Sequence, residues 1–155
     1  MKGYNQIMDI KTKLNDAMKD AMKSGDEVGR RMTRTVLAAI KQVEVDKQTT
    51  LDDMAVMGLI QKEIKNCREA IEDAKKADRP DVITDREAEI KVLQVFLPQA
   101  MPADELRAIV QAAITETAAA GPSDMGKVMK IVVPKVAGRA PNDMISATVK
   151  ELLAK

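Results

Sequence analysis

Apolar side chains recur at intervals of three and four residues along almost the whole sequence, which is the spacing of one face of an α-helix. The longest such run carries its apolar residues on a single stripe: Met54, Met57, Ile60, Ile64, Cys67, Ile71 and Ala74. No segment of useful length alternates apolar and polar residues as a half-buried strand does. The sequence therefore predicts an all-α fold.

Two prolines within Leu97–Pro102 mark the strongest boundary in this pattern, because proline ends one helix and begins the next. We therefore predict an N-terminal helical subdomain of about four helices, residues 1–97, followed by a compact C-terminal three-helix bundle, residues 98–155. Within the first subdomain, Thr49 and Thr50 are expected to supply the N-cap of the third helix.

The core must form almost without aromatic packing, because Tyr4 and Phe96 are the only aromatic residues. Aliphatic residues and eleven methionines must fill it, and methionine suits the irregular gaps between helices. A methionine-rich surface also suits partner binding. Met54 and Met57, together with the second helix, are therefore candidates for the groove or dimer face of a protein–protein adaptor.

Charge and targeting signals exclude several classes of protein. The formal net charge of +1 gives no general attraction to nucleic acid or to a membrane surface. The opening Met1–Gln6 lacks the apolar run of a signal peptide, and no stretch approaches the ~18 apolar residues of a membrane span. A single cysteine, Cys67, excludes an intramolecular disulfide. We expect a cytoplasmic protein with no membrane partner.

Nothing in the sequence points to a catalytic or metal site. Histidine is absent, which removes the commonest general base and the commonest metal ligand. Cys67 lies on an apolar stripe, where we expect a buried and inert thiol. The carboxylate pairs Asp52/Asp53 and Glu87/Glu89 lie on charged helices, where we expect solvated side chains. We therefore predict no enzyme, no cofactor and no metal site.

The most distinctive stretch is Gly121–Met129. A glycine inside a helix weakens it, so Gly126 predicts that another backbone or a ligand approaches closely, and packing within the C-terminal subdomain is the favoured reason. Free N–H groups near Ser123 are also placed to hold a phosphate beside Lys127, because a helix N-terminus attracts anions.

Cationic side chains follow this stretch and form the candidate RNA-binding set: Lys127, Lys130, Lys135, Arg139 and Lys150. Contacts of these groups with phosphates would give sequence-independent, salt-sensitive binding. No aromatic residue accompanies them, so a folded duplex or an RNA elbow is a better target than stacked single-stranded bases. Ordinary solvated lysines are the alternative interpretation.

The same region carries a resemblance to the GatB/YqeY family, and specifically to its stand-alone YqeY-like proteins. The similar segments keep their order across nearly the whole chain: Leu14–Lys23, Leu97–Pro98, Asp104–Leu106, Asp124–Met129, Pro134–Ala140 and Val149–Leu153. The resemblance implies an N-terminal helical part and a C-terminal three-helix part similar to the tail domain of the GatB protein of tRNA-dependent amidotransferase.

In that amidotransferase the tail helps to hold the tRNA, while the chemistry lies in other domains. The resemblance therefore implies tRNA contact at Lys127, Lys130, Lys135 and Arg139, and a non-catalytic role in tRNA metabolism. The family label also carries carbon–nitrogen ligase activity with glutamine as amido-N-donor. Two alternatives stay open: an accessory part of such a ligase, bound to an amidotransferase complex, and a protein–protein adaptor.

Overall fold

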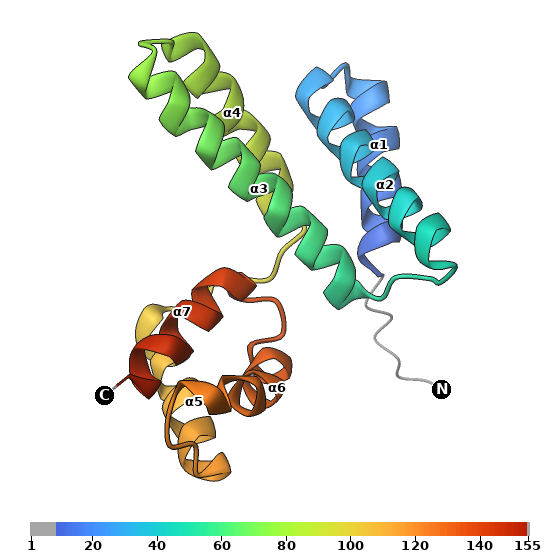
Figure 1. Ribbon diagram of the computed structural model, residues 1–155. Helices are drawn as coiled ribbons and strands as arrows, with labels where there is room; N and C mark the ends of the chain where they lie inside the picture. Colours follow the sequence, from blue (N-terminus) through green and yellow to red (C-terminus); the bar gives the residue numbers. More distant parts are fainter. Residues whose placement is uncertain (1–8, 155) are drawn as a thin grey trace. The chain divides into compact units, whose positions relative to one another are not determined.

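The computed structural model describes residues 9–154, and this range is almost entirely helical (Figure 1). It contains no strand, which confirms the predicted all-α fold. None of its helices has both the length and the apolar character that crossing a membrane requires. The helices are α1 (Ile10–Ser24), α2 (Glu27–Lys47), α3 (Asp53–Lys76), α4 (Pro80–Gln94), α5 (Ala103–Thr117), the short 3-10 helix η1 (Pro122–Asp124), α6 (Met125–Val136) and α7 (Asn142–Leu153).

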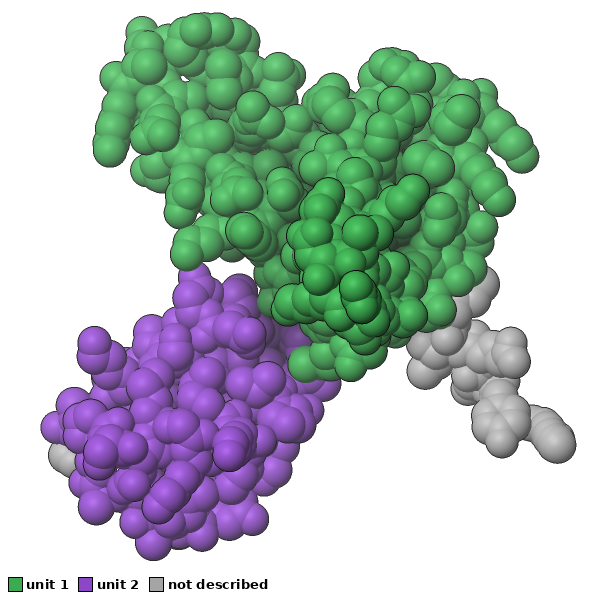
Figure 2. Space-filling model, turned by 45° about the vertical axis from the view of Figure 1, so that its right-hand side comes forward, with its two compact units in different colours: residues 1–97 green, residues 98–155 purple. Residues whose placement is uncertain are grey.

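The chain divides into two compact units, residues 1–97 and residues 98–155, which Figure 2 colours separately. The boundary between the two units lies between Leu97 and Pro98, and Pro102 follows four residues after Pro98. Each unit has a hydrophobic core of its own. Each therefore buries its apolar surface among its own helices.

The first unit consists of two helical hairpins, α1 with α2 and α3 with α4. The turns of both hairpins point the same way in Figure 1 and lie apart, while α2 packs against both α3 and α4. The buried core residues come from all four helices: Ile10, Leu14, Met32, Val36, Ile40, Val56, Met57, Ile60, Ile64, Cys67 and Leu93. Aliphatic side chains, methionine and the single cysteine thus fill the buried core, as the sequence predicts.

The turn between α1 and α2 depends on two glycines. Gly25 adopts the left-handed conformation at φ 75°, where its N–H closes α1 on the carbonyl of Ala21. Asp26 then caps α2 by accepting a hydrogen bond from the N–H of Gly29 at 3.0 Å. A Cβ on Gly29 would collide with the Asp26 carboxylate. Gly29 weakens the first turn of α2, but its lack of a side chain leaves room for the Asp26 carboxylate that caps this helix.

At the opposite end of the first hairpin, two carboxylates bind the start of α1 to its neighbours. The Ile10 N–H donates to Asp53 Oδ1 at 3.0 Å. Glu44 Oε2 accepts hydrogen bonds from the Lys11 ammonium and from the Leu51 N–H, each at 2.7 Å. The bond from Lys11 is the main reason that the pKa of Glu44 lies below its ordinary value, and the Leu51 N–H adds to it. These bonds join α1, α2 and α3 across long stretches of sequence.

The N-cap predicted for α3 is wrong, because Asp52 and not a threonine fills that position. The Asp52 carboxylate accepts a hydrogen bond from the Ala55 N–H at 2.9 Å, and Thr49 and Thr50 precede the cap. A carboxylate at the helix start also interacts favourably with the helix dipole. Helix α4 begins with Pro80, which lacks an N–H at a position where none is needed.

The second unit packs α5, α6 and α7 around a small core in which valine is prominent. The buried members are Met101, Leu106, Val110, Ala113, Val128, Val132, Val136, Ala140, Ile145, Val149 and Leu153. Several of these positions are spaced four residues apart within their helices, so each helix presents one apolar stripe to the other two. The short side chains suit helices of only twelve to fifteen residues.

Candidate nucleic-acid interface

The outward face of α6 is formed by residues that recur at helical spacing. Val128, Val132 and Val136 of this helix are fully buried. The exposed residues of the helix lie on other sides of it: Gly126, Lys127, Lys130, Pro134 and Lys135. We use the name α6 face for Gly126, Lys127, Lys130 and Pro134. The sequence of α6 contains no acidic residue, so the charge on the α6 face is positive.

Lys127 and Lys130 lie on the same side of the helix, about 60° apart around its axis. Lys127 is 71% exposed and has its ammonium 3.6 Å from Asp124 Oδ1, which makes a weak surface pair. Lys130 forms no ion pair with any residue that the structure describes. The side chains of both lysines are therefore able to reach a bound anion.

The other predicted RNA-binding residues lie elsewhere in the second unit. Lys135 is on α6 but about 140° around the helix from Lys130, and its ammonium lies 3.9 Å from Glu116 of α5. Lys150 is exposed on α7, and Arg139 lies in the turn between α6 and α7. The structure thus brings only two of the five residues onto one helix face.

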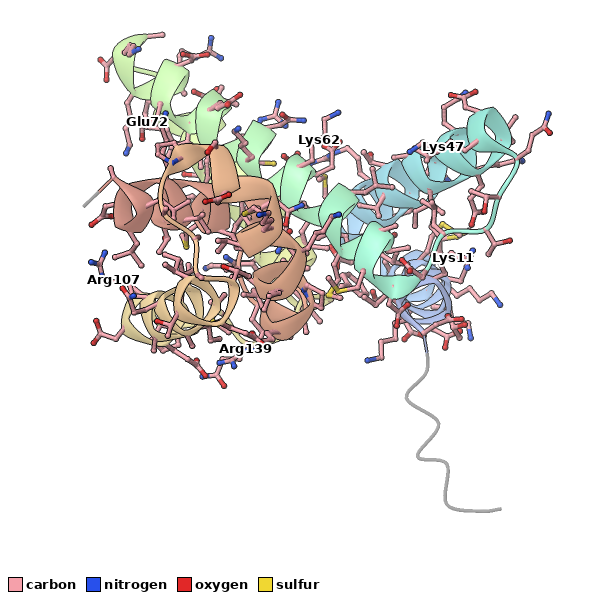
Figure 3. The ribbon with its side chains drawn as sticks, turned by 60° about the horizontal axis from the view of Figure 1, so that its bottom comes forward. Lys11, Lys47, Lys62, Glu72, Arg107 and Arg139 are labelled. Atoms are coloured by element: carbon pink, nitrogen blue, oxygen red, sulfur yellow. The ribbon has the colours of Figure 1, made fainter. Side chains whose placement is uncertain are left out.

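Arg139 is engaged in contacts inside its own unit. Its guanidinium binds both oxygens of Glu105, at 3.2 and 3.0 Å, and Nε donates to the carbonyl of Gln99 at 3.1 Å. Its own carbonyl accepts the Met101 N–H at 2.8 Å. Arg107 Nη1 donates to Glu151 Oε1 at 2.9 Å, and both arginines are labelled in Figure 3. Arg139 therefore joins the start of α5 to the α6–α7 turn.

Gly126 does not serve close packing between helices, and that interpretation is wrong. A Cβ built on this residue would meet no atom within 4 Å among the described residues. Gly126 is instead exposed, as the second residue of α6. Its lack of a side chain leaves the backbone beside Lys127 and Lys130 open to approach from outside.

The start of α6 already holds a negative charge. Asp124 accepts the Ala120 N–H at 2.9 Å, and this bond, aided by Lys127, holds the pKa of Asp124 below its ordinary value. The N–H groups of Asp124 and Met125 are used within η1, on the carbonyls of Gly121 and Pro122. A phosphate would therefore meet a carboxylate at this helix end, so the side of α6 is the better anion site.

A buried carboxylate in the first unit was missed at the sequence level. Glu89 of α4 has only 4% of its side chain exposed, so the prediction that it is solvated is wrong. Arg31 of α2 binds Oε1 at 2.9 Å, Arg86 binds Oε2 at 2.7 Å, and the Cys67 thiol lies 3.5 Å from Oε2. One carboxylate thus links α2, α3 and α4.

The electrostatics of this group indicate a structural ion pair. Burial raises the pKa of Glu89, but the hydrogen bonds from Arg86 and Arg31 together outweigh it and hold the pKa below its ordinary value. Burial, with the adjacent Glu89, raises the pKa of Cys67 to about 11. The prediction that Cys67 is buried is confirmed. No group of side chains suited to a metal ion occurs within residues 9–154.

Comparison with known proteins identifies the relatives of this chain. Several fungi have proteins named "Altered inheritance of mitochondria protein 41, mitochondrial" that are similar to this chain. The one from Pyrenophora tritici-repentis is 27% identical over 144 residues, 91% of this chain and 79% of the relative. Those from Lachancea thermotolerans and Vanderwaltozyma polyspora are 31% and 32% identical, over 75% and 54% of this chain.

The matched segments span 64% and 46% of those last two relatives, so the chain corresponds to part of their length. A family model described as Yqey-like protein matches residues 11–153, which extend over most of both units and over every α-helix of the described residues except the first residue of α1. The predicted resemblance is confirmed, and the chain belongs to the YqeY-like protein family.

Proposed function

We propose that this chain is a non-catalytic RNA-binding protein of tRNA metabolism, and that it binds the RNA backbone through the α6 face. The observation that carries the proposal is the pair Lys127 and Lys130 on one side of a helix that has no acidic residue. Gly126 and Pro134 flank the pair and project little from the helix. An extended polyanion can therefore reach both ammonium groups at once.

The binding is local and electrostatic. The whole chain has a net charge of only +1, so attraction depends on where the charges lie. Two lysines that neutralise two phosphates give salt-dependent binding with little preference for sequence. The α6 face carries no aromatic residue on which a base can stack. The backbone of a folded RNA, such as a tRNA, is the ligand that this chemistry favours.

The test measures tRNA affinity by fluorescence anisotropy at 50 mM salt for the intact chain and for the double variant Lys127→Glu/Lys130→Glu. The control double variant Lys62→Glu/Lys65→Glu makes the same charge change on exposed positions of α3, with the same spacing. We expect the α6 variant to lose at least about tenfold in affinity and the control to lose little. Equal losses in both variants, or no binding by the unaltered chain, would refute the proposal.

Salt dependence gives an independent measurement of the same contacts. Each phosphate that a lysine neutralises contributes about 0.9 to the slope of log affinity against log salt concentration. The slope for the α6 variant should therefore be smaller than that of the unaltered chain by about 2. Arg139 is left unchanged in this experiment, because its bonds to Glu105 and Gln99 stabilise the fold.

The non-catalytic part of the proposal is supported by the chemistry of the ionisable groups. The chain has no histidine, and its buried carboxylate, Glu89, is neutralised by two arginines. The Cys67 thiol is buried and stays protonated near neutral pH. An accessory role in a carbon–nitrogen ligase that uses glutamine is the alternative. Release of ammonia from glutamine by the purified chain alone would favour it and refute the non-catalytic proposal.

The adaptor hypothesis has less support from the side chains it named. Met57 is buried in the core of the first unit, and Met54 is 38% exposed. The other exposed large apolar residues of the described range are scattered over α1, α2, the end of α4 and α7: Met22, Val45, Val95 and Met144. Scattered single apolar residues on a surface are normal and do not indicate a docking site.

A cytoplasmic location is part of the proposal and is tested separately. The names of the fungal relatives place those proteins in mitochondria. Fractionation of cells that produce a tagged full-length chain separates the two locations. Recovery of the chain in the cytosolic fraction is expected, and recovery in mitochondria would refute this part.

A further inference from the structure

Pro134 lies inside α6, two residues before its end at Val136, and its ring is exposed. Proline has no N–H, so the carbonyl four residues earlier, that of Lys130, loses its usual helical donor. Proline inside a helix is also the most unfavourable residue for helix stability. The buried core of the second unit does not require it, because the residue points away from that core.

The carbonyl released by Pro134 lies within the α6 face. A helical carbonyl points along the axis toward the residue four positions later, so the oxygen of Lys130 is directed toward Pro134. Both of these residues are exposed. The α6 face therefore carries a hydrogen-bond acceptor on the C-terminal side of Lys127 and Lys130, whose side chains lean toward the start of the helix.

This combination suits one ligand chemistry. The ammonium groups attract phosphate, and the carbonyl oxygen requires a donor, which a phosphodiester does not have. In RNA each phosphate is next to a ribose 2′-hydroxyl, which can donate a hydrogen bond. We propose that the Lys130 carbonyl accepts a hydrogen bond from a 2′-hydroxyl while the lysines bind the flanking phosphates, so that the α6 face distinguishes RNA from strands without that hydroxyl.

This inference rests on the proposed function, because it needs RNA to bind at the α6 face. It adds a source of specificity that lysines alone do not provide. A single neutral hydrogen bond contributes about two- to tenfold in an equilibrium constant. The preference for the 2′-hydroxyl should therefore be modest, and it should depend on Pro134 and not on the lysine charges.

The experiment compares the affinity of the intact chain for an RNA hairpin and for the same hairpin with 2′-fluoro ribose. The fluorine removes the donor, while the helix stays close to the RNA form. We expect the unmodified hairpin to bind about two- to tenfold more tightly. Pro134→Ala restores an N–H to the Lys130 carbonyl and should abolish this preference, so that the variant binds the two hairpins with equal affinity. Pro102→Ala, at an exposed proline before α5, is the matched control and should keep the preference.

The outcomes separate the two claims. Equal binding of both hairpins by the unaltered chain would overturn the 2′-hydroxyl inference and leave phosphate binding standing. A preference that survives in Pro134→Ala would overturn it as well. If the chain bound neither hairpin at low salt, the proposed function itself would fail, and the inference would fail with it.

Discussion

Replacing Glu89 by glutamine removes the charge that links α2, α3 and α4 while keeping the shape of the side chain. The two arginines that bind the carboxylate, Arg31 and Arg86, then meet a neutral amide instead. Removing one partner of a buried ion pair costs about 3–5 kcal/mol. Arg31 and Arg86 keep 52% and 42% of their side chains exposed, so water can solvate part of each guanidinium after the change, although Arg86 Nε is buried. We therefore expect the lower end of that range, about 3 kcal/mol.

The assay is urea unfolding of the intact chain, followed by far-ultraviolet circular dichroism. With a dependence on urea of about 1.5 kcal/mol per molar, the midpoint for the first unit should fall by about 2 M. Hydrogen exchange of peptides from α4 assigns the loss to this unit, because the second unit has a separate core. Protection in α4 should fall, and protection in α6 should not change.

Glu87→Gln is the matched control, because Glu87 is exposed and lies two residues earlier on the same helix. Surface substitutions of this kind usually change stability by less than about 0.5 kcal/mol. If Glu89→Gln also changed stability by less than about 0.5 kcal/mol, the ion pair would contribute nothing measurable and the reasoning would be wrong.

Three further predictions follow from single groups. Folding lowers the pKa of Glu89, so its stabilising contribution is complete above the ordinary glutamate pKa and is lost as the pH falls through the lower, folded value. Between pH 7 and pH 3, the urea midpoint should therefore fall less steeply for Glu89→Gln than for the unaltered chain. Gly126→Ala meets no neighbouring atom and should stabilise the second unit by about 0.5–1 kcal/mol in thermal unfolding, while weakening tRNA binding; a lower melting temperature would contradict this. Cys67, with its pKa raised to about 11, should be alkylated by iodoacetamide at pH 8 about 100-fold more slowly in the folded chain than in urea; equal rates would show that the thiol is accessible.

The helices could be predicted because their signals are local. Apolar spacing identifies the buried stripe of α3. The pair Pro98 and Pro102 interrupts helical structure between α4 and α5 for an equally local reason. Each of these inferences needs only a few adjacent residues.

Contacts between distant residues account for what the sequence did not reveal. Glu89 occupies a core-facing position of α4, three residues after Arg86 and four before the buried Leu93. Sequence reasoning nevertheless places a charged residue at such a position in solvent. The partner that explains its burial, Arg31, is 58 residues away. In the sequence, the burial of Glu89 is indicated only by its helical spacing from the apolar Leu93.

The candidate site shows the same limit. Lys127 and Lys130 could be placed on one side of a helix from their spacing alone. The engagement of Arg139 with Glu105, 34 residues earlier, depends on how α5 meets the α6–α7 turn. The exposure of Gly126 depends in the same way on tertiary packing, because only the folded unit shows that no helix crosses at that point.

A nuclear magnetic resonance titration of the 15N-labelled intact chain with a tRNA hairpin at low salt would show directly whether RNA binds at the α6 face. Amide signals of Gly126, Lys127 and Lys130 should shift progressively, while those of α1 and α3 stay in place. Shifts confined to the first unit, or no shifts at hairpin concentrations that exceed the protein severalfold, would contradict binding at this face.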